Sequence, residues 1–169
     1  MVVKIVEQLF RYYVDLGHEL ELKKLYYKRL RRISRFLSGF LLLTSAGSIV
    51  TLSCWQKFPV LWVVISLAAQ VIQTLQPLMD FSKKRDALGY IIQDERALFD
   101  QVCLYWNKIS RIQVDDKTEY EIDDQVLAWK TRQREIRNRF LPDLDITPSK
   151  RMERKAKELN CRYFWYYYN

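Results

Sequence analysis

The feature that most constrains this chain is a long uncharged block, residues 36–79, whose only charged side chain is Lys57. An α-helix needs about 20 apolar residues to cross roughly 30 Å of hydrocarbon. The block divides into Phe36–Gln56 and Phe58–Met79, and each part has about this length. We therefore expect a hairpin of two membrane-spanning helices, with a buried hairpin inside a soluble helical protein as the alternative.

The charges that flank this block predict its orientation. The chain carries 28 Lys and Arg against 20 Asp and Glu, a formal net charge of +8, and many of the basic residues lie close to the two uncharged stretches. Short cytoplasmic segments retain Lys and Arg, whereas translocated segments do not. Both termini are therefore expected in the cytoplasm. The flanking basic residues are Lys23, Lys24, Lys28, Arg29, Arg31, Arg32 and Arg35 before the block, and Lys83, Lys84 and Arg85 after it.

The pattern outside the block is helical, which makes the expected fold class an all-α membrane protein. Residues 1–35 read as a basic and aromatic cytoplasmic helix, residues 36–79 as the two-transmembrane hairpin, and residues 80–169 as a cytoplasmic helical region. Apolar residues recur every three or four positions in two stretches, as expected for amphipathic helices. They are Val3, Val6, Leu9, Phe10, Tyr13, Leu16 and Leu20 in the first, and Leu88, Ile91, Leu98, Val102, Tyr105 and Ile109, with Glu95 among them, in the second.

The second uncharged stretch carries polar residues on one helical face. Ser66, Gln70 and Gln73 are separated by four and three positions, and Thr74 flanks them. Glutamine in hydrocarbon needs hydrogen-bond partners, so these side chains should face protein or water. A water-filled pore in a homo-oligomer, taken as a tetramer, and interhelical contacts within such an oligomer are both open. Matching pore-lining candidates in the first stretch are Thr44, Ser48 and Thr51.

Basic residues also gather near the C-terminus, in two further predicted helices. Thr147 followed by Pro148 suits the cap and first position of the last helix. Arginines beside aromatic residues are typical of sites that bind phosphates and bases, although a solvated helix face is the commoner outcome. The predicted ligand-binding residues are Lys130, Arg132, Arg134, Arg137, Arg139, Lys150, Arg151, Arg154 and Lys155.

No residue pattern indicates catalysis. His18 is the only histidine, no nucleophile constellation accompanies it, and four glycines provide no phosphate-binding loop. The three cysteines show no metal-ligand spacing. We therefore expect a protein that is not an enzyme and that needs no metal or cofactor.

Three features together resemble the SLATT family of two-transmembrane effectors. They are the basic and aromatic segment LYYKRLRRISRF, the hairpin, and the amphipathic segment DFSKKRDALGYIIQDERALFDQVCLYW, which cover roughly residues 20–112. The resemblance implies an abortive-infection effector of bacterial anti-phage defence in the inner membrane. It also implies an oligomeric gated ion channel or pore, controlled by a nucleotide or single-stranded oligonucleotide signal from a partner nucleotidyltransferase. The alternative is a non-conducting membrane anchor or scaffold that recruits a soluble partner through its cytoplasmic helices.

Overall fold

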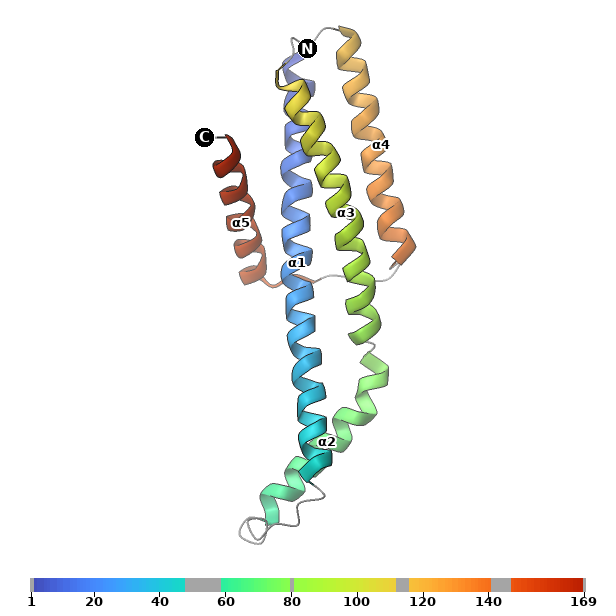
Figure 1. Cartoon of the computed structure of the whole chain (residues 1–169), viewed down its shortest axis with the longest axis vertical. Coiled ribbons are helices and arrows are strands. Elements are labelled where there is room, and N and C mark those ends of the chain that lie inside the picture. The colour runs from blue at the N-terminus through green and yellow to red at the C-terminus, as the bar shows by residue number, and fades with distance from the viewer. Residues whose placement is uncertain (1, 48–58, 80, 112–115, 141–146, 169) are drawn as a thin grey trace. The chain divides into compact units, whose positions relative to one another are not determined.

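The chain folds into five α-helices, shown by a computed structural model that describes residues 2–47, 59–79, 81–111, 116–140 and 147–168 (Figure 1). They are α1 (Val2–Gly47), α2 (Pro59–Met79), α3 (Phe81–Ile109), α4 (Asp116–Phe140) and α5 (Lys150–Tyr168). The described residues contain no strand, so the predicted all-α class is confirmed. The helices form two compact units: unit 1 is Met1–Tyr27 with Asp86–Asn169, and unit 2 is Lys28–Arg85.

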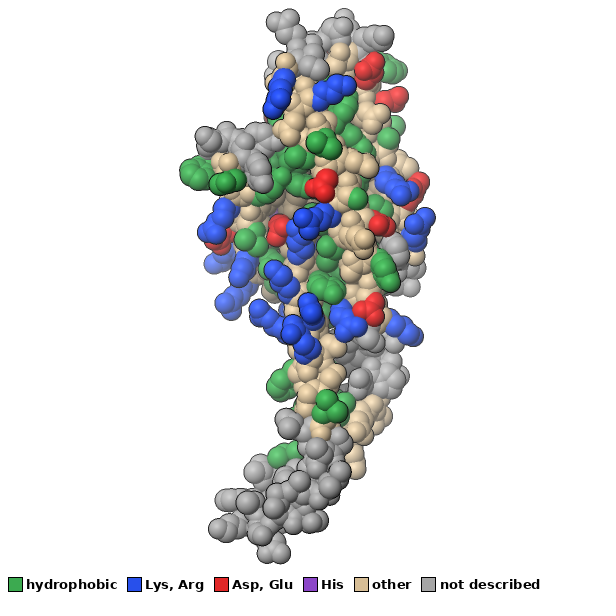
Figure 2. All heavy atoms as spheres, in the orientation of Figure 1, with side chains coloured by type: hydrophobic (Ala, Val, Ile, Leu, Met, Phe, Trp, Pro, Cys, Tyr) green, Lys and Arg blue, Asp and Glu red, His purple; other side chains and the backbone are tan. Residues whose placement is uncertain are grey.

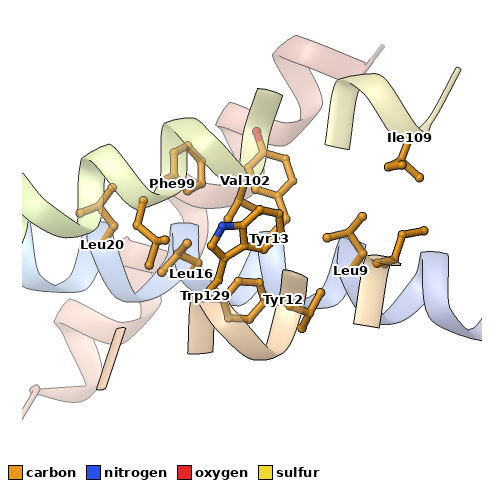
Figure 3. Packing of buried hydrophobic residues seen from close by; sticks show 12 residues of the cluster. Leu9, Tyr12, Tyr13, Leu16, Leu20, Phe99, Val102, Ile109 and Trp129 are labelled. Atoms are coloured by element: carbon orange, nitrogen blue, oxygen red, sulfur yellow. The ribbon is translucent and has the colours of Figure 1, made fainter. Parts of the chain in front are cut away.

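The core of unit 1 forms along the apolar stripe that the sequence predicts for its first helix. Leu9, Tyr13, Leu16 and Leu20 of α1 are all buried, at the expected spacing of three or four residues. The predicted stripe of α3 is buried as well, from Leu88 to Ile109, with Tyr105 partly covered. Burial of these side chains away from water is the main favourable contribution to folding. Figure 3 shows how the rings and aliphatic side chains interdigitate.

Helices α4 and α5 pack against α1 and α3 through different aromatic residues. On α4, Trp129 stacks with Tyr12 at 6.5 Å and meets Tyr105 edge-on at 5.2 Å, measured between ring centroids. On α5, Phe164 meets the ring of Tyr13 edge-on at 4.8 Å. Figure 1 shows α4 and α5 flanking the α1–α3 pair on different sides. The two C-terminal helices therefore present two separate outer surfaces.

The prediction of two membrane spans is wrong for the part of the chain that the structure describes, because none of its helices combines the length and apolar character needed to cross a bilayer. The uncharged part of α1 within the described residues, Phe36–Gly47, would rise only about 18 Å along the helix axis. In α2, Gln70 and Gln73 interrupt the apolar run. The absence of charged residues is a weaker criterion for a membrane-spanning helix than the absence of all polar side chains, because uncharged polar groups are also costly in hydrocarbon. The prediction of a multi-pass protein of the bacterial inner membrane with cytoplasmic termini depended on these two spans and is contradicted by the same finding.

Unit 2 leaves much of its apolar surface exposed in the single chain. Ala69 is the buried apolar residue among the described side chains of α2. Val60, Val63, Leu67 and Val71 of the same helix are at least half exposed. Contiguous exposed apolar side chains mark interaction surfaces in folded proteins.

Candidate functional site

The first turn of α5 begins two positions later than the sequence suggests. Ser149 caps it: its carbonyl accepts hydrogen bonds from the backbone N–H groups of Met152 at 2.8 Å and Glu153 at 3.1 Å, and its hydroxyl accepts one from Met152 at 3.4 Å. Thr147 and Pro148 precede this cap instead of forming it. Serine is as good a cap as threonine because its short side-chain oxygen reaches the free amides of the first turn.

The cations of α5 lie where the helix dipole does not favour them. Lys150, Arg151, Arg154 and Lys155 occupy its first two turns, with Glu153 as the one acidic residue there. The N-terminal end of a helix carries partial positive charge, so cations at this end cost stability. All four are exposed, and within the described part of the chain none forms an ion pair. A sequence that breaks a local rule without visible compensation points to function.

One face of α5 joins these cations to an exposed tryptophan. Ala156 and Asn160 mark the buried face, and the residues opposite them are exposed. We call these outward residues the α5 stripe: Arg151, Arg154, Glu158, Arg162 and Trp165. Arg162 reaches Glu158 at 4.0 Å, and Trp165 is 68% exposed. The stripe therefore offers guanidinium groups for phosphates and an indole ring for stacking.

The cations of α4 have a simpler structural explanation. Its first half is acidic and its last turn carries Arg137 and Arg139, which is the arrangement that the helix dipole favours. Arg132 pairs with Glu135 at 3.3 Å, and Lys130 lies 6.0 Å from the centroid of the Tyr12 ring. The predicted nine-residue ligand site is thus divided between α4 and α5, over which Lys and Arg side chains gather on opposite sides of the bundle (Figure 2).

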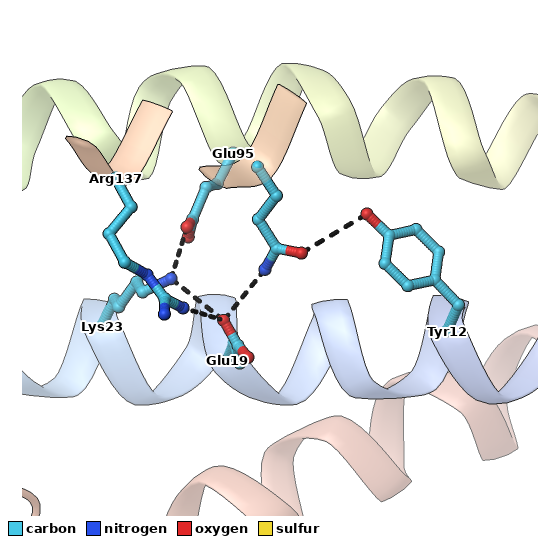
Figure 4. Close-up of polar contacts among 6 residues, drawn as sticks. Tyr12, Glu19, Lys23, Glu95 and Arg137 are labelled. Carbon is cyan, nitrogen blue, oxygen red and sulfur yellow. Dashed lines mark hydrogen bonds and ion pairs between the residues drawn. The ribbon is translucent and has the colours of Figure 1, made fainter. Parts of the chain in front are cut away.

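A buried polar network joins α1, α3 and α4 (Figure 4). Lys23 of α1 is 7% exposed and pairs with Glu95 of α3, which is 0% exposed. Lys23 also donates to Glu19 at 3.2 Å. From α4, Gln133 donates to the same carboxylate at 3.0 Å and Arg137 reaches it at 3.5 Å. The network fixes the register of three helices, because its polar groups satisfy one another only in this alignment.

Burial dominates the electrostatics of Glu95. Removal from water raises the pKa of Glu95 above its usual value, and the attraction of Lys23 offsets only part of this. Its Oε2 atom has no hydrogen-bond partner among the described residues. Burial also raises the pKa of Tyr12, which keeps the phenol protonated as a donor to Gln133 at 3.5 Å. Glu95 lies within the apolar stripe of α3, and an acidic residue in such a stripe is the sequence signal for this network.

The predicted pore-lining residues lie in unit 2. Ser66 is partly exposed, and Gln70, Gln73 and Thr74 are exposed. The Thr74 hydroxyl donates to the backbone carbonyl of Gln70 at 2.9 Å, so it is satisfied within its own helix. The side chains of Thr44, Ser48 and Thr51 lie outside the described residues.

No known protein family, curated protein or solved structure matches this chain. The resemblance to the SLATT family therefore remains a hypothesis from the sequence.

Proposed function

We propose that this protein is a non-catalytic binding protein that holds a single-stranded oligonucleotide along the α5 stripe. The observation that carries the proposal is the placement of Arg151 and Arg154 against the helix dipole, on the face that also exposes Trp165. A bound phosphate would interact with the cations and with the helix N-terminus together. An exposed indole adds stacking, which tolerates any base sequence.

The anti-phage role stays a prediction. In such a system the oligonucleotide would be the signal made by a partner nucleotidyltransferase, and α5 would be its receptor. The pore of the sequence analysis required membrane-spanning helices and is not part of this proposal. Recruitment of a soluble protein partner by the exposed helices is the alternative function, and it predicts no affinity for nucleic acid.

The test is fluorescence anisotropy with a labelled thymidine oligonucleotide, titrated at several salt concentrations. Phosphate contacts by the three arginines of the stripe would give a slope of log affinity against log salt of about −2 for a single strand. Replacement of both Arg151 and Arg154 by glutamine should reduce that slope by about 1.4. Replacement of Trp165 by alanine should weaken binding by about 1–3 kcal/mol and leave the slope unchanged.

Arg111→Gln supplies the matched control, because Arg111 is an exposed arginine just beyond α3. If the control lowers affinity and slope as much as the α5 variants do, binding is diffuse attraction to a basic protein and the site proposal fails. Absence of binding to the intact chain at low salt would instead favour the protein-recruiting alternative.

We further propose that the chain self-associates through the exposed apolar face of α2. Val63, Leu67 and Val71 lie on this face at spacings of four and remain exposed in the single chain. A symmetric oligomer would cover them, as is usual for soluble assemblies. Light scattering should report more than one copy for the wild type and a monomer for Val63→Glu. The proposed number of copies is four, and a monomeric wild type would contradict self-association altogether.

A further inference from the structure

A pocket of about 280 Å³ opens in unit 1 between α1, α3 and α5, away from the α5 stripe. Its volume lies just below the roughly 300–1,000 Å³ of small-molecule sites. Leu20 and Phe99 supply its apolar wall, and four charged side chains surround it. They are Glu21 and Lys24 of α1 with Arg96 and Asp100 of α3. A pocket of this size suits a ligand no larger than an amino acid.

The four charges cancel, but only two of them are paired. Lys24 and Glu21 form an ion pair at 2.7 Å. Arg96 and Asp100 lie one helical turn apart with opposite charge, yet neither forms an ion pair within the described part of the chain. Adjacent opposite charges on a helix commonly pair. Here the guanidinium and the carboxylate are left available on the same wall, with an overall lining charge of zero.

Asn160 provides a further polar group at this pocket. The side chain is only 6% exposed, and its Nδ2 donates to the backbone carbonyl of Val14 at 3.0 Å. No described residue donates to its Oδ1 atom. Gly17 makes room for this amide, because a Cβ at that position would lie 2.6 Å from Oδ1. This amide oxygen faces the pocket, where a ligand or water can supply the missing donor.

We propose that this pocket binds a free α-amino acid with an apolar side chain. The ligand's carboxylate pairs with Arg96, and its ammonium group donates to Asp100 and to the Oδ1 atom of Asn160. Its side chain packs against Leu20 and Phe99. A zwitterion fits a lining of zero net charge, since a ligand with a single charge would face an unmatched group of the same sign. The proposal does not depend on oligonucleotide binding to α5.

The experiment is a titration of the ¹⁵N-labelled full chain with L-leucine, followed by NMR. Isopentylamine and 4-methylpentanoate, which carry the same side chain with only the ammonium or only the carboxylate, are the matched ligands. L-leucine should shift the side-chain amide of Asn160 and the backbone amide of Gly17. Each half-ligand should bind at least about tenfold more weakly, because one charge-assisted hydrogen bond is lost.

Two variants test the assigned roles. Arg96→Gln and Asp100→Asn change exposed side chains, and each should weaken L-leucine binding about tenfold. Arg111→Gln should leave it unchanged. The proposal is overturned by an absence of shifts at about 10 mM L-leucine, by half-ligands that bind as well as L-leucine, or by folded variants that bind like the control.

Discussion

The Lys23–Glu95 pair offers the sharpest test of how unit 1 is held together. Replacement of Lys23 by methionine keeps an unbranched apolar side chain of similar length but leaves the carboxylate of Glu95 buried without its cation. Glu95 is 0% exposed, so water cannot replace the lost partner. Breaking a buried ion pair in this way costs about 3–5 kcal/mol, a large part of the roughly 5–15 kcal/mol that stabilises a typical domain.

The double variant Lys23→Met with Glu95→Leu separates the ion pair from the space that it fills. It removes both charges and leaves an apolar contact, which is often neutral or stabilising relative to the original pair. The coupling free energy between the two substitutions should therefore be about 3 kcal/mol or more. Glu19 keeps its hydrogen bonds from Gln133 and Arg137 in this variant, so the α1–α4 contact persists.

Urea unfolding followed by circular dichroism gives the free energies from linear extrapolation. The control is Arg11→Met, which breaks the exposed pair with Glu7, where the side chains are 73% and 54% exposed. That pair is worth less than about 1 kcal/mol. The loss in Lys23→Met should also shrink as the pH falls, because protonation of Glu95 removes the uncompensated charge. The reasoning is refuted if Lys23→Met costs no more than Arg11→Met, or if the double variant is as unstable as the worse single one.

Further predictions concern pH and packing. Because the pKa of Glu95 in the folded protein lies above 4.5, the contribution of Glu95 to stability is fully present below about pH 4.5 and is lost as the pH rises through that folded pKa. The test compares the unfolding free energies of the wild type and of Glu95→Gln across this pH range. The difference, wild type minus variant, should fall as the pH rises. A flat difference would mean that the pKa is not raised. Gly17→Ala should lower the stability of the folded chain by about 1 kcal/mol in thermal melts, because overpacking against Asn160 outweighs the gain in helix propensity. Gly39→Ala is the control: no described atom lies within 4 Å of the added Cβ, so this variant should be as stable as the wild type or more stable. Trp129→Ala should cost about 3–5 kcal/mol in urea unfolding, and a cost below 1 kcal/mol would show that α4 is not held by this ring.

The helices of unit 1 were predictable because their signal is local. A period of three to four residues reports which side of a helix is apolar, and it correctly marked Leu9, Tyr13 and Leu16. The prediction of membrane spans in the uncharged block was wrong for a different reason. It relied on the absence of charged residues and gave too little weight to glutamines such as Gln70 and Gln73.

The residues of the sites were predictable only in part. Arg151 and Arg154 were chosen from the sequence by their charge, but Trp165 was not, because an exposed and a buried tryptophan have the same sequence signal. Arg137 was assigned to a ligand, whereas its guanidinium lies 3.5 Å from Glu19 of α1. Which cations remain unpaired depends on neighbours from other helices, and those are distant in sequence.

The sequence by itself determined that this chain is helical and which side of each helix of unit 1 is apolar, since both follow from intrinsic propensity and periodicity along one segment. Only the tertiary structure decided which helices share a core. It brings Tyr13 of α1 beside Phe164 of α5 and joins Lys23 to Glu95 across 72 positions. Contacts over such separations depend on how whole helical faces fit together, and that fit is a property of the packed bundle, not of any one segment.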